Sequence, residues 1–396
     1  MSTGAIIKRV SKSGKTSYLV KYDLPRDPAT NKRRQAYKTV RGTKAEAAAE
    51  LRRLLALVDR GEYVDASKMT VGQWIDKWLV DYAPLGRSQK TFERYAELLR
   101  LHVKPTFGAT PVQKITATQV DELYTKLRAT LAERTILHVH RVFGLSLKDA
   151  ARKQVISRSP MANVTTPSPT KVEAGTDDVK EQIHALDQAK LDTLLRHFRG
   201  SSLFRMVALD AATGLRQGEL LALRWSDIDF DRCRIRVERS VEDTKEYGLR
   251  FKAPKNKTSR RTIAIDAGTA AMLNAYRLEA AETALAFGVR LPDDALLFPD
   301  RADRFYAPRR GRNVTKEFTR IVGKLGREFD GFRFHDIRHT HATLLLTNGV
   351  PITAVSQRLG HASPTITLGV YAHLVPQAEE KAVEVCASFI AHYVNG

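Results

Sequence analysis

Five side chains in the second half of the sequence could act together on a phosphodiester bond. In chain order they are Arg216, His335, Arg338, His361 and Tyr371. Arginine stays charged and binds phosphate oxygens through two parallel hydrogen bonds, and histidine can donate a proton or relay one. A tyrosine hydroxyl can attack phosphorus, although only about 0.1% of it is ionised at pH 7 when its pKa is near 10. The set predicts transesterification of a phosphate ester with Tyr371 as the nucleophile.

Each of these residues taken alone has a simpler interpretation. His335 and His339 have the spacing of half a zinc site, but no HExxH motif and no nearby cysteine completes it. Arg216 by itself could simply pair with Glu219 on the next helical turn, and Tyr371 by itself could be a core residue. The full set favours catalysis. We expect neither a metal ion nor another cofactor, because guanidinium groups can stabilise the developing charge.

The motifs that carry these residues resemble those of the tyrosine recombinases, the phage-integrase family. The family's R-x-x-E-L is matched by Arg216–Leu220, and its H-x-x-R-H by His335–His339. Its L-G-H followed by a tyrosine is matched by Leu359–His361 and Tyr371. Its hairpin lysine, usually within P-K-T-K, is matched by Pro254–Lys257, where asparagine replaces threonine. Each motif alone is weak evidence for this family, but the occurrence of all of them in this order is highly specific.

The resemblance assigns a role to each of these residues. Tyr371 would attack DNA and form a covalent 3′-phosphotyrosyl intermediate. Lys255 would protonate the leaving 5′ oxygen, and Lys257 is the alternative acid. Glu219 and His339 would support the site. The remaining members of the catalytic set would be Arg216, His335, Arg338 and His361.

The resemblance also implies how the protein would assemble and with what. The family clamps double-stranded DNA at core attachment sites, and integrases with an added N-terminal domain bind arm sites too. Four protomers would act as a homotetramer that passes through a Holliday junction. No ATP is needed, because the protein–DNA bond keeps the energy of the broken phosphodiester. Whether an excision factor takes part stays open.

The composition agrees with a polyanionic partner. The chain has 396 residues, with 65 Lys and Arg against 44 Asp and Glu, a formal net charge of +21. Such a surplus favours nucleic acid over other partners. No apolar run approaches the roughly 20 residues that span a bilayer, so we expect no membrane partner. Two distant cysteines, Cys233 and Cys386, fit a reducing compartment. We expect the protein in the cytoplasm of a bacterial host, associated with the nucleoid.

Residues 1–64 predict a small DNA-binding domain of three strands and a helix. The strands are expected in AIIKRV, TSYLVKYDL and RRQAYKTV, and the helix between a Thr43–Glu46 capping box and Gly61. Residues 1–60 hold 15 Lys and Arg against 5 Asp and Glu, and Tyr18, Tyr22 and Tyr37 lie among them. We interpret the unit as an arm-type DNA-binding domain. Its expected contacts are Lys8, Arg9, Lys21, Arg33, Arg34 and Lys38.

Three further segments complete the expected organisation. Residues 70–164 predict four helices, which resemble the family's SAM-like core-binding domain, with one helix capped by Thr118 and Asp121. Their expected DNA contacts are Arg87, Lys90 and Arg94. Residues 165–178 predict a linker rich in Pro, Ser and Thr. Residues 179–396 predict a mainly helical catalytic domain with a small antiparallel sheet, so the fold class is multidomain α+β.

The predicted function is a site-specific DNA recombinase that integrates or excises a phage or another mobile element at attachment sites. Three enzymes with similar chemistry are alternatives: a conjugative-transposon integrase, a chromosome-dimer-resolving recombinase and a type IB topoisomerase. The dimer-resolving enzymes lack the arm domain that this chain is expected to have. A DNA-binding repressor or architectural protein is the non-enzyme alternative, and it has no need of an aligned tyrosine.

Overall fold

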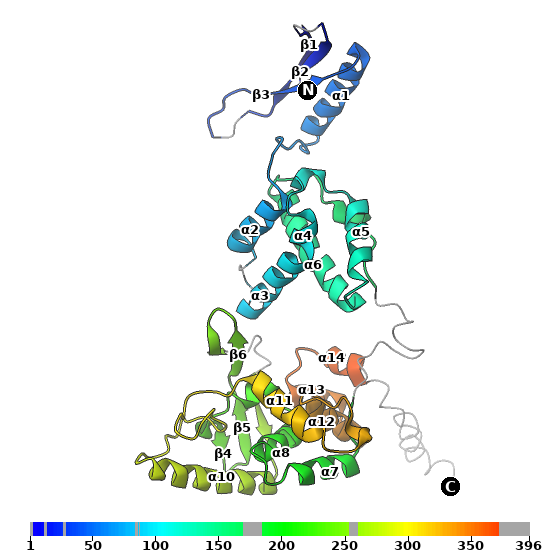
Figure 1. Cartoon of the computed structure of the whole chain (residues 1–396). Helices are drawn as coiled ribbons and strands as arrows, with labels where there is room; N and C mark the ends of the chain where they lie inside the picture. The colour runs from blue at the N-terminus through cyan, green and yellow to red at the C-terminus, as the bar shows by residue number, and fades with distance from the viewer. Residues whose placement is uncertain are drawn as a thin grey trace, which may run out of the picture. The chain divides into compact units, whose positions relative to one another are not determined.

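The computed structural model describes residues 3–11, 14–26, 29–83, 86, 88–168, 184–252 and 260–371 (Figure 1). The chain divides into two compact units, Met1–Thr170 and Lys171–Gly396. The first unit has two separate hydrophobic cores, one in the N-terminal sheet and one among helices α2 to α6. The finer division at residues 64, 70, 164 and 179 stays a prediction. Within the described ranges, no helix combines the length and apolar character needed to cross a bilayer.

The N-terminal segment folds as expected into three antiparallel strands and one helix. The strands are β1 (Gly4–Val10), β2 (Thr16–Leu24) and β3 (Arg34–Val40), in the order β1-β2-β3. Helix α1 (Lys44–Asp59) begins after Thr43, and the predicted capping box with Glu46 is present. Gly61 follows the helix with a left-handed φ of 69°. Val20, Tyr22 and Leu24 pack against α1 to form the core.

The strand register distributes the basic residues over both faces of this sheet, because directly opposed residues share a face. Lys8 lies opposite Tyr18, Arg34 opposite Leu24 and Lys38 opposite Val20, so these three share the face that packs on α1. Arg9 and Lys21 lie on the other face, which we call the open face.

The three tyrosines that lie among the basic residues of this domain are not equivalent. Tyr22 is 4% exposed, and its hydroxyl donates a 3.1 Å hydrogen bond to the hydroxyl of Tyr63. Tyr18 packs against the same core as Tyr22. Tyr37 is 56% exposed on the open face, opposite Lys21. Tyr18 and Tyr22 thus contribute to the core with α1, whereas Tyr37 lies on the open face.

The helical segment forms a bundle around two buried tryptophans. Its helices are α2 (Val71–Asp81), α3 (Gln89–Leu98), α4 (Lys104–Phe107), α5 (Ala117–Leu127) and α6 (Glu133–Arg152), with a π-helical turn at Leu99–Val103. The indole of Trp74 donates to the Ser146 carbonyl at 3.2 Å, and that of Trp78 to Asp149 at 2.8 Å. Both tryptophans are fully buried, as expected of core residues.

The predicted cap of α5 was wrong. The N-cap is Thr116, whose hydroxyl accepts from the Gln119 N–H, and the Gln119 side chain accepts from the Thr116 N–H in return. Thr118 lies inside the helix, and Asp121 accepts the N–H of Thr165 at 3.0 Å. Two overlapping patterns of capping residues, one beginning at Thr116 and one at Thr118, fit the start of this helix. The backbone of Thr116 is extended, as is typical of an N-cap, so the earlier pattern forms the cap.

The second unit is mainly helical. Its helices are α7 (Gln188–Phe198), α8 (Phe204–Thr213), α9 (Gln217–Leu220), α10 (Ala267–Ala286), α11 (Gly311–Val322), α12 (Asp336–Thr347), α13 (Ile352–Leu359) and α14 (Pro364–Tyr371). Strands β4 (Ile228–Asp229), β5 (Arg234–Val237) and β8 (Arg261–Ala264) form an antiparallel sheet in the order β4-β5-β8. Strands β6 (Ser240–Thr244) and β7 (Gly248–Lys252) form a hairpin.

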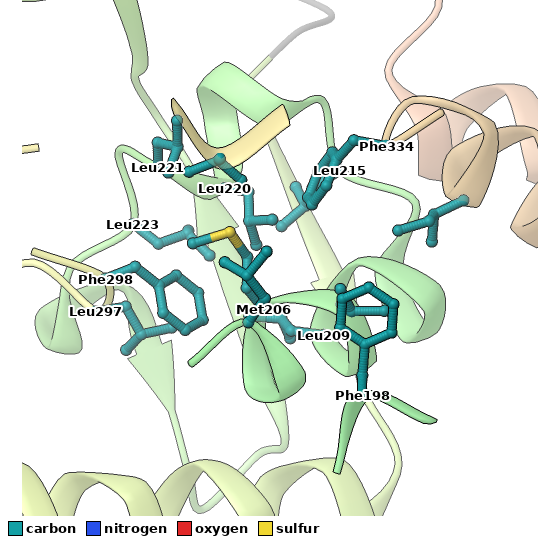
Figure 2. Packing of buried hydrophobic residues seen from close by; sticks show 14 of the residues in the cluster. Phe198, Met206, Leu209, Leu215, Leu220, Leu221, Leu223, Leu297, Phe298 and Phe334 are labelled. Atoms are coloured by element: carbon teal, nitrogen blue, oxygen red, sulfur yellow. The ribbon is translucent and has the colours of Figure 1, made fainter. Parts of the chain in front are cut away.

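A single large core fixes the elements that carry the predicted site. Figure 2 shows Phe198 from α7, Met206 and Leu209 from α8, and Leu220 from α9 converging with Phe334, which lies just before the N-cap of α12. All five side chains are buried. Because α8, α9 and α12 share this core, the residues that follow α8 and that begin α9 and α12 lie at fixed positions in one unit.

Candidate active site

Arg216 lies at the start of α9, as the sequence predicted. Helix α8 ends at Gly214 in a left-handed conformation with φ 61°, and Arg216 is the N-cap of α9. The Arg216 backbone N–H and its guanidinium both donate to Glu219, each at 3.0 Å. A second guanidinium nitrogen donates to the Gly360 carbonyl at 3.1 Å. With 39% of its side chain exposed, Arg216 can still reach a ligand.

Glu219 is buried between two arginines. Besides Arg216, it accepts from both terminal nitrogens of Arg261 on β8, at 3.2 and 2.9 Å. Burial works to raise the pKa of Glu219, but the hydrogen bonds and charges of Arg261 and Arg216 outweigh it and lower this pKa below its usual value. Glu219 is therefore a carboxylate, and it orients Arg216.

Arg338 on α12 is the most enclosed cation of the set, with 3% exposure. Its guanidinium donates to the carbonyls of Gly214 at 2.6 Å and Leu359 at 2.8 Å, and to Nε2 of His361 at 2.9 Å. Burial, helped by the nearby charge of Arg216, lowers the pKa of Arg338 to about 10. The group stays charged at neutral pH, and three acceptors fix its plane.

His361 follows the turn that ends α13. Gly360 closes this helix in a left-handed conformation with φ 67°, which suits glycine. Burial and the surrounding arginines, first Arg338, lower the pKa of His361 to about 4. The ring is therefore neutral at pH 7. Because Arg338 donates to Nε2, the proton is on Nδ1, which can donate to the Thr367 hydroxyl at 2.8 Å.

His335 lies at the N-cap of α12, with its ring edge-on to that of His339 at a centroid distance of 5.1 Å. The ring is exposed, yet the protein around it and the charges of His339 and Arg338 lower its pKa to about 4. In the free protein His335 is thus a neutral ring next to several cations. The negative charge of a phosphate would act in the opposite direction and favour its protonation.

Tyr371 ends α14 and is covered. Helix α14 begins on Pro364 after Ser363, whose hydroxyl accepts the N–H of Thr365 at 3.1 Å. Tyr371 is 2% exposed, and its hydroxyl lies 2.6 Å from Nδ1 of His339. Burial raises the pKa of Tyr371 to about 12, although the charge of Arg338 opposes this shift. The phenol is therefore neutral and can donate to His339.

The structure thus brings together, in one unit, six residues that the sequence singled out: Arg216, Glu219, Arg338, His339, His361 and Tyr371. His335 lies next to His339. Lys255 and Lys257 are outside the described residues, as is Arg87. Lys90 and Arg94 are exposed on α3, where Arg94 pairs with Glu97 at 3.0 Å.

Sequence reasoning missed three residues behind the site: Arg261, His341 and Arg358. The Arg358 guanidinium donates to Nε2 of His341 and to the carbonyls of Ala212 and Ala264. His341 is 7% exposed, and its Nδ1 lies 2.8 Å from the Ala211 carbonyl. The available signal was their position inside or beside the motifs, in RHTH, QRLGH and SRRT. Their residue types alone are equally typical of a solvated surface.

No group of three or more potential metal ligands (His, Cys, Asp or Glu) occurs among the residues that the structure describes. The donors that converge on the site are instead guanidinium and imidazole groups. Such a site suits phosphoryl transfer through a covalent ester between protein and phosphate.

Comparison with known proteins gives the family. Residues 176–378 match the phage integrase family, and residues 70–128 match the N-terminal SAM-like domain of phage integrases. The chain belongs to the phage integrase family, and it is a tyrosine site-specific recombinase of the integrase type. It is similar to a "Tyrosine recombinase XerC-like" protein of Caldanaerobacter subterraneus, with 27% identity over 94% of this chain and 96% of the relative. It is also similar to the ICEBs1 integrase of Bacillus subtilis, with 26% identity over 74% of this chain and 76% of the relative.

Solved structures share the fold. The Tn1549 transposon integrase in complex with a circular intermediate DNA matches with a TM-score of 0.64 and 21% identity, covering 80% of this chain and 99% of that one. The lambda integrase tetramer bound to a Holliday junction matches with a TM-score of 0.55 and 17% identity, covering 90% of this chain and 96% of that one. The expected mainly helical architecture with small antiparallel sheets is confirmed.

Proposed function

We propose that Arg216 and Arg338 bind the scissile phosphate of a DNA attachment site and that Tyr371 attacks it. The tyrosine oxygen forms a bond to phosphorus, the bond from phosphorus to the 5′ oxygen breaks, and a 3′-phosphotyrosyl ester remains. The released 5′ oxygen takes a proton. Attack on the ester by a 5′ hydroxyl from the partner duplex reverses these steps and rejoins DNA in a new combination, without ATP.

One observation carries this proposal: the Tyr371 hydroxyl contacts His339 on the same helix turn that carries Arg338. His339 can accept the phenol proton as the oxygen attacks. Arg338 and Arg216 are held by neighbouring main-chain carbonyls, those of Leu359 and Gly360. Donors fixed in advance stabilise charge that develops in the transition state without the cost of reorganising them.

The Tyr371 hydroxyl must become exposed before it can attack a phosphate. A side chain that is 2% exposed does not reach a phosphate in solution, so α14 has to shift when DNA binds. The phosphate also brings negative charge to His335 and His361, which raises their pKa values and allows them to donate to its oxygens.

A nicked duplex that carries the protein's own attachment site tests the nucleophile. The fragment beyond the nick diffuses away after cleavage, so the covalent adduct accumulates and is seen on a denaturing gel. Tyr371→Phe should bind this DNA and form no adduct. Tyr306→Phe is the matched control, because Tyr306 is an exposed tyrosine of the same unit, hydrogen-bonded to Asp294 at 2.9 Å. An adduct with Tyr371→Phe would disprove the assignment.

The acid is proposed to be Lys255, with Lys257 as the alternative. Sulfur in place of the bridging 5′ oxygen makes a leaving group that needs no proton. Lys255→Ala should cleave the sulfur substrate about as well as the unmodified protein and fail on ordinary DNA. If Lys257→Ala shows that behaviour instead, the roles are exchanged.

The N-terminal sheet is proposed to bind arm sites through its open face. That face carries Arg9 and Lys21, and the Lys21 ammonium lies 6.0 Å from the centre of the Tyr37 ring. A sheet face of this kind can enter the major groove, where base edges are distinguishable. Residues 70–396 would clamp the core site, and a homotetramer would assemble on two duplexes and resolve a Holliday junction. The same proposal includes an excision factor as a partner and the cytoplasm of the host as the location of the protein.

A further inference from the structure

Arg261 connects two parts of the site without belonging to any motif of the family resemblance. It is the first residue of β8, and its side chain is 7% exposed. Its two terminal nitrogens donate to the carboxylate of Glu219, and its Nε donates to the Arg358 carbonyl at 2.7 Å. Every nitrogen of the guanidinium is therefore engaged inside the protein, and this arginine is not free to bind a phosphate.

The contact of Arg261 with Glu219 determines how much of the positive charge of Arg216 remains for a ligand. Glu219 is a buried carboxylate, and a buried charge needs a partner. Arg261 supplies that partner from inside the protein, while Arg216 meets the same carboxylate from the exposed side. Asp210 is another buried acid near Arg338, and burial raises its pKa well above the usual range. Without Arg261, Arg216 alone would have to neutralise the negative charge of Glu219.

The second connection fixes the turn that supplies acceptors to both clamping arginines. Arg261 holds the carbonyl of Arg358, and the next two carbonyls accept from Arg338 and Arg216 respectively. A Cβ atom on Gly360 would lie 2.9 Å from a terminal nitrogen of Arg261 and 3.1 Å from its Cζ. The glycine thus lets the guanidinium pack directly against the turn.

We propose that Arg261 is a positioning residue for the phosphate clamp: it neutralises Glu219 from within, so that Arg216 keeps its charge for the scissile phosphate, and it fixes the 358–360 turn. This inference rests on the proposed roles of Arg216 and Arg338. Arg261 touches neither the substrate nor the reacting atoms, and it acts through Glu219 and the main chain.

The test compares two versions of a nicked duplex that carries the core sequence protected by the protein. One has an ordinary phosphate at the scissile position, and the other has a neutral methylphosphonate, which depends less on positive charge in the clamp. On ordinary phosphate, Arg261→Ala should lower the rate of adduct formation by about tenfold or more, part of the 100- to 1,000-fold typical of losing a direct donor. On methylphosphonate, its deficit relative to the unmodified protein should shrink severalfold.

Two variants complete the design. Arg261→Lys restores one positive charge but cannot reach both Glu219 and the Arg358 carbonyl, so its rate on phosphate should fall between those of Arg261→Ala and the unmodified protein. It also decides the matter if thermal unfolding shows that Arg261→Ala is not folded. Arg205→Ala, the control, removes another Arg–Glu pair of the same unit, formed with Glu279, and should react normally.

Equal deficits on phosphate and methylphosphonate, or no deficit on either, would overturn the inference. The adduct formed by the unmodified protein on the same DNA tests the proposed chemistry separately. The ratios between variants test Arg261, so the two hypotheses can fail independently.

Discussion

Single residues of this site are held mainly by the protein's own main chain. Arg338 illustrates this, because two carbonyls and one imidazole accept from its guanidinium before any DNA is present. Arg216 differs, since its two terminal nitrogens donate to Glu219 and to the Gly360 carbonyl while 39% of the side chain stays exposed. The two arginines should therefore respond differently to substitution.

Lysine at either position keeps the charge and loses the planar fork. We expect Arg216→Lys and Arg338→Lys each to lower the rate of adduct formation about 100-fold or more. Arg338→Lys should also lower the free energy of unfolding by about 1–3 kcal/mol, because buried acceptors lose their donors. Arg216→Lys should unfold almost like the unmodified protein. Adduct gels and thermal unfolding measure the two effects, and near-normal cleavage by Arg216→Lys would contradict a bidentate role.

The sequence was sufficient to select Arg216, Arg338, His361 and Tyr371, because each stands in a motif with a fixed spacing. It could not show that Tyr371 is covered. The cover arises from the packing of α14 on α12 and α13, where Tyr371 joins a small core with Leu346 and Val355. It also could not identify Arg261, since an arginine that binds a buried carboxylate and one that faces water look alike in sequence.

At the scale of elements, the 358–360 turn and α14 contain two glycines in opposite situations. Gly360 has a left-handed backbone and the Arg261 guanidinium against it, whereas a Cβ atom on the helical Gly369 would meet nothing within 4 Å. The first glycine is required by the fold. The second lowers the stability of the helix that carries Tyr371 without any packing reason.

These two glycines give a matched pair of substitutions. Gly360→Ala should reduce both stability and adduct formation, because it strains the backbone and displaces Arg261. Gly369→Ala should stabilise α14 by about 0.5–1 kcal/mol and slow adduct formation, since the helix must loosen to deliver the tyrosine. Rates on the nicked duplex, measured alongside thermal unfolding, check both. A Gly369→Ala protein that reacts as fast as the unmodified one would show that this glycine is incidental.

His341 on α12 makes hydrogen bonds to Ala211 on α8 and to Arg358 on α13, and it should make the free energy of unfolding depend on pH. Burial lowers the pKa of His341 to about 4, with Arg358 and Arg338 adding to the effect, from a usual value of 6.5. Between these values the unfolded chain binds a proton at this position and the folded chain does not. The free energy of unfolding should therefore fall as the pH drops from about 6.5 to 4, by roughly 3 kcal/mol from this residue.

Replacing His341 checks that contribution. His341→Gln removes the titrating group and should flatten the fall in stability below pH 6.5, although the variant is less stable at pH 7. Urea unfolding at pH 7 and pH 5 gives the comparison. If the two proteins lose the same stability between these pH values, the dependence comes from other residues, such as His335 and His361.

At the scale of the whole molecule, the fold class and the order of the segments were predictable, since strands, capping boxes and helical periodicity are local signals. The two faces of the N-terminal sheet were not, because register and the packing of α1 decide them. The register separates Lys21 on the open face from Lys38, which pairs with Glu50 at 2.7 Å.

This separation predicts which lysine binds arm DNA. Lys21→Ala should weaken binding to flanking arm sequences and reduce the salt dependence of affinity by about one counterion. Lys38→Ala, on the face packed against α1, should change both far less. Binding titrations at two or more salt concentrations measure the slope, and a larger loss with Lys38→Ala would place the DNA on the other face.

A truncated chain beginning near Lys68 tests the arm as a separate DNA-binding part. It should still form an adduct on a core site through Tyr371, and it should lose protection of flanking sequences and efficient recombination of long attachment sites. Footprinting of both proteins on one long DNA makes the comparison. Identical footprints would mean that the first 64 residues act as a nonspecific basic tether.

The covered position of Tyr371 also bears on dosage in the cell. A chain with a net charge of +21 is expected to bind chromosomal DNA at many non-specific sites. With an attack-ready phenol, each of these encounters would risk a strand break, and the damage would grow with every added copy of the enzyme. Under the proposed mechanism, a phenol that stays shielded until α14 moves would make random encounters harmless, so that many copies of the enzyme could be present without damage to the genome.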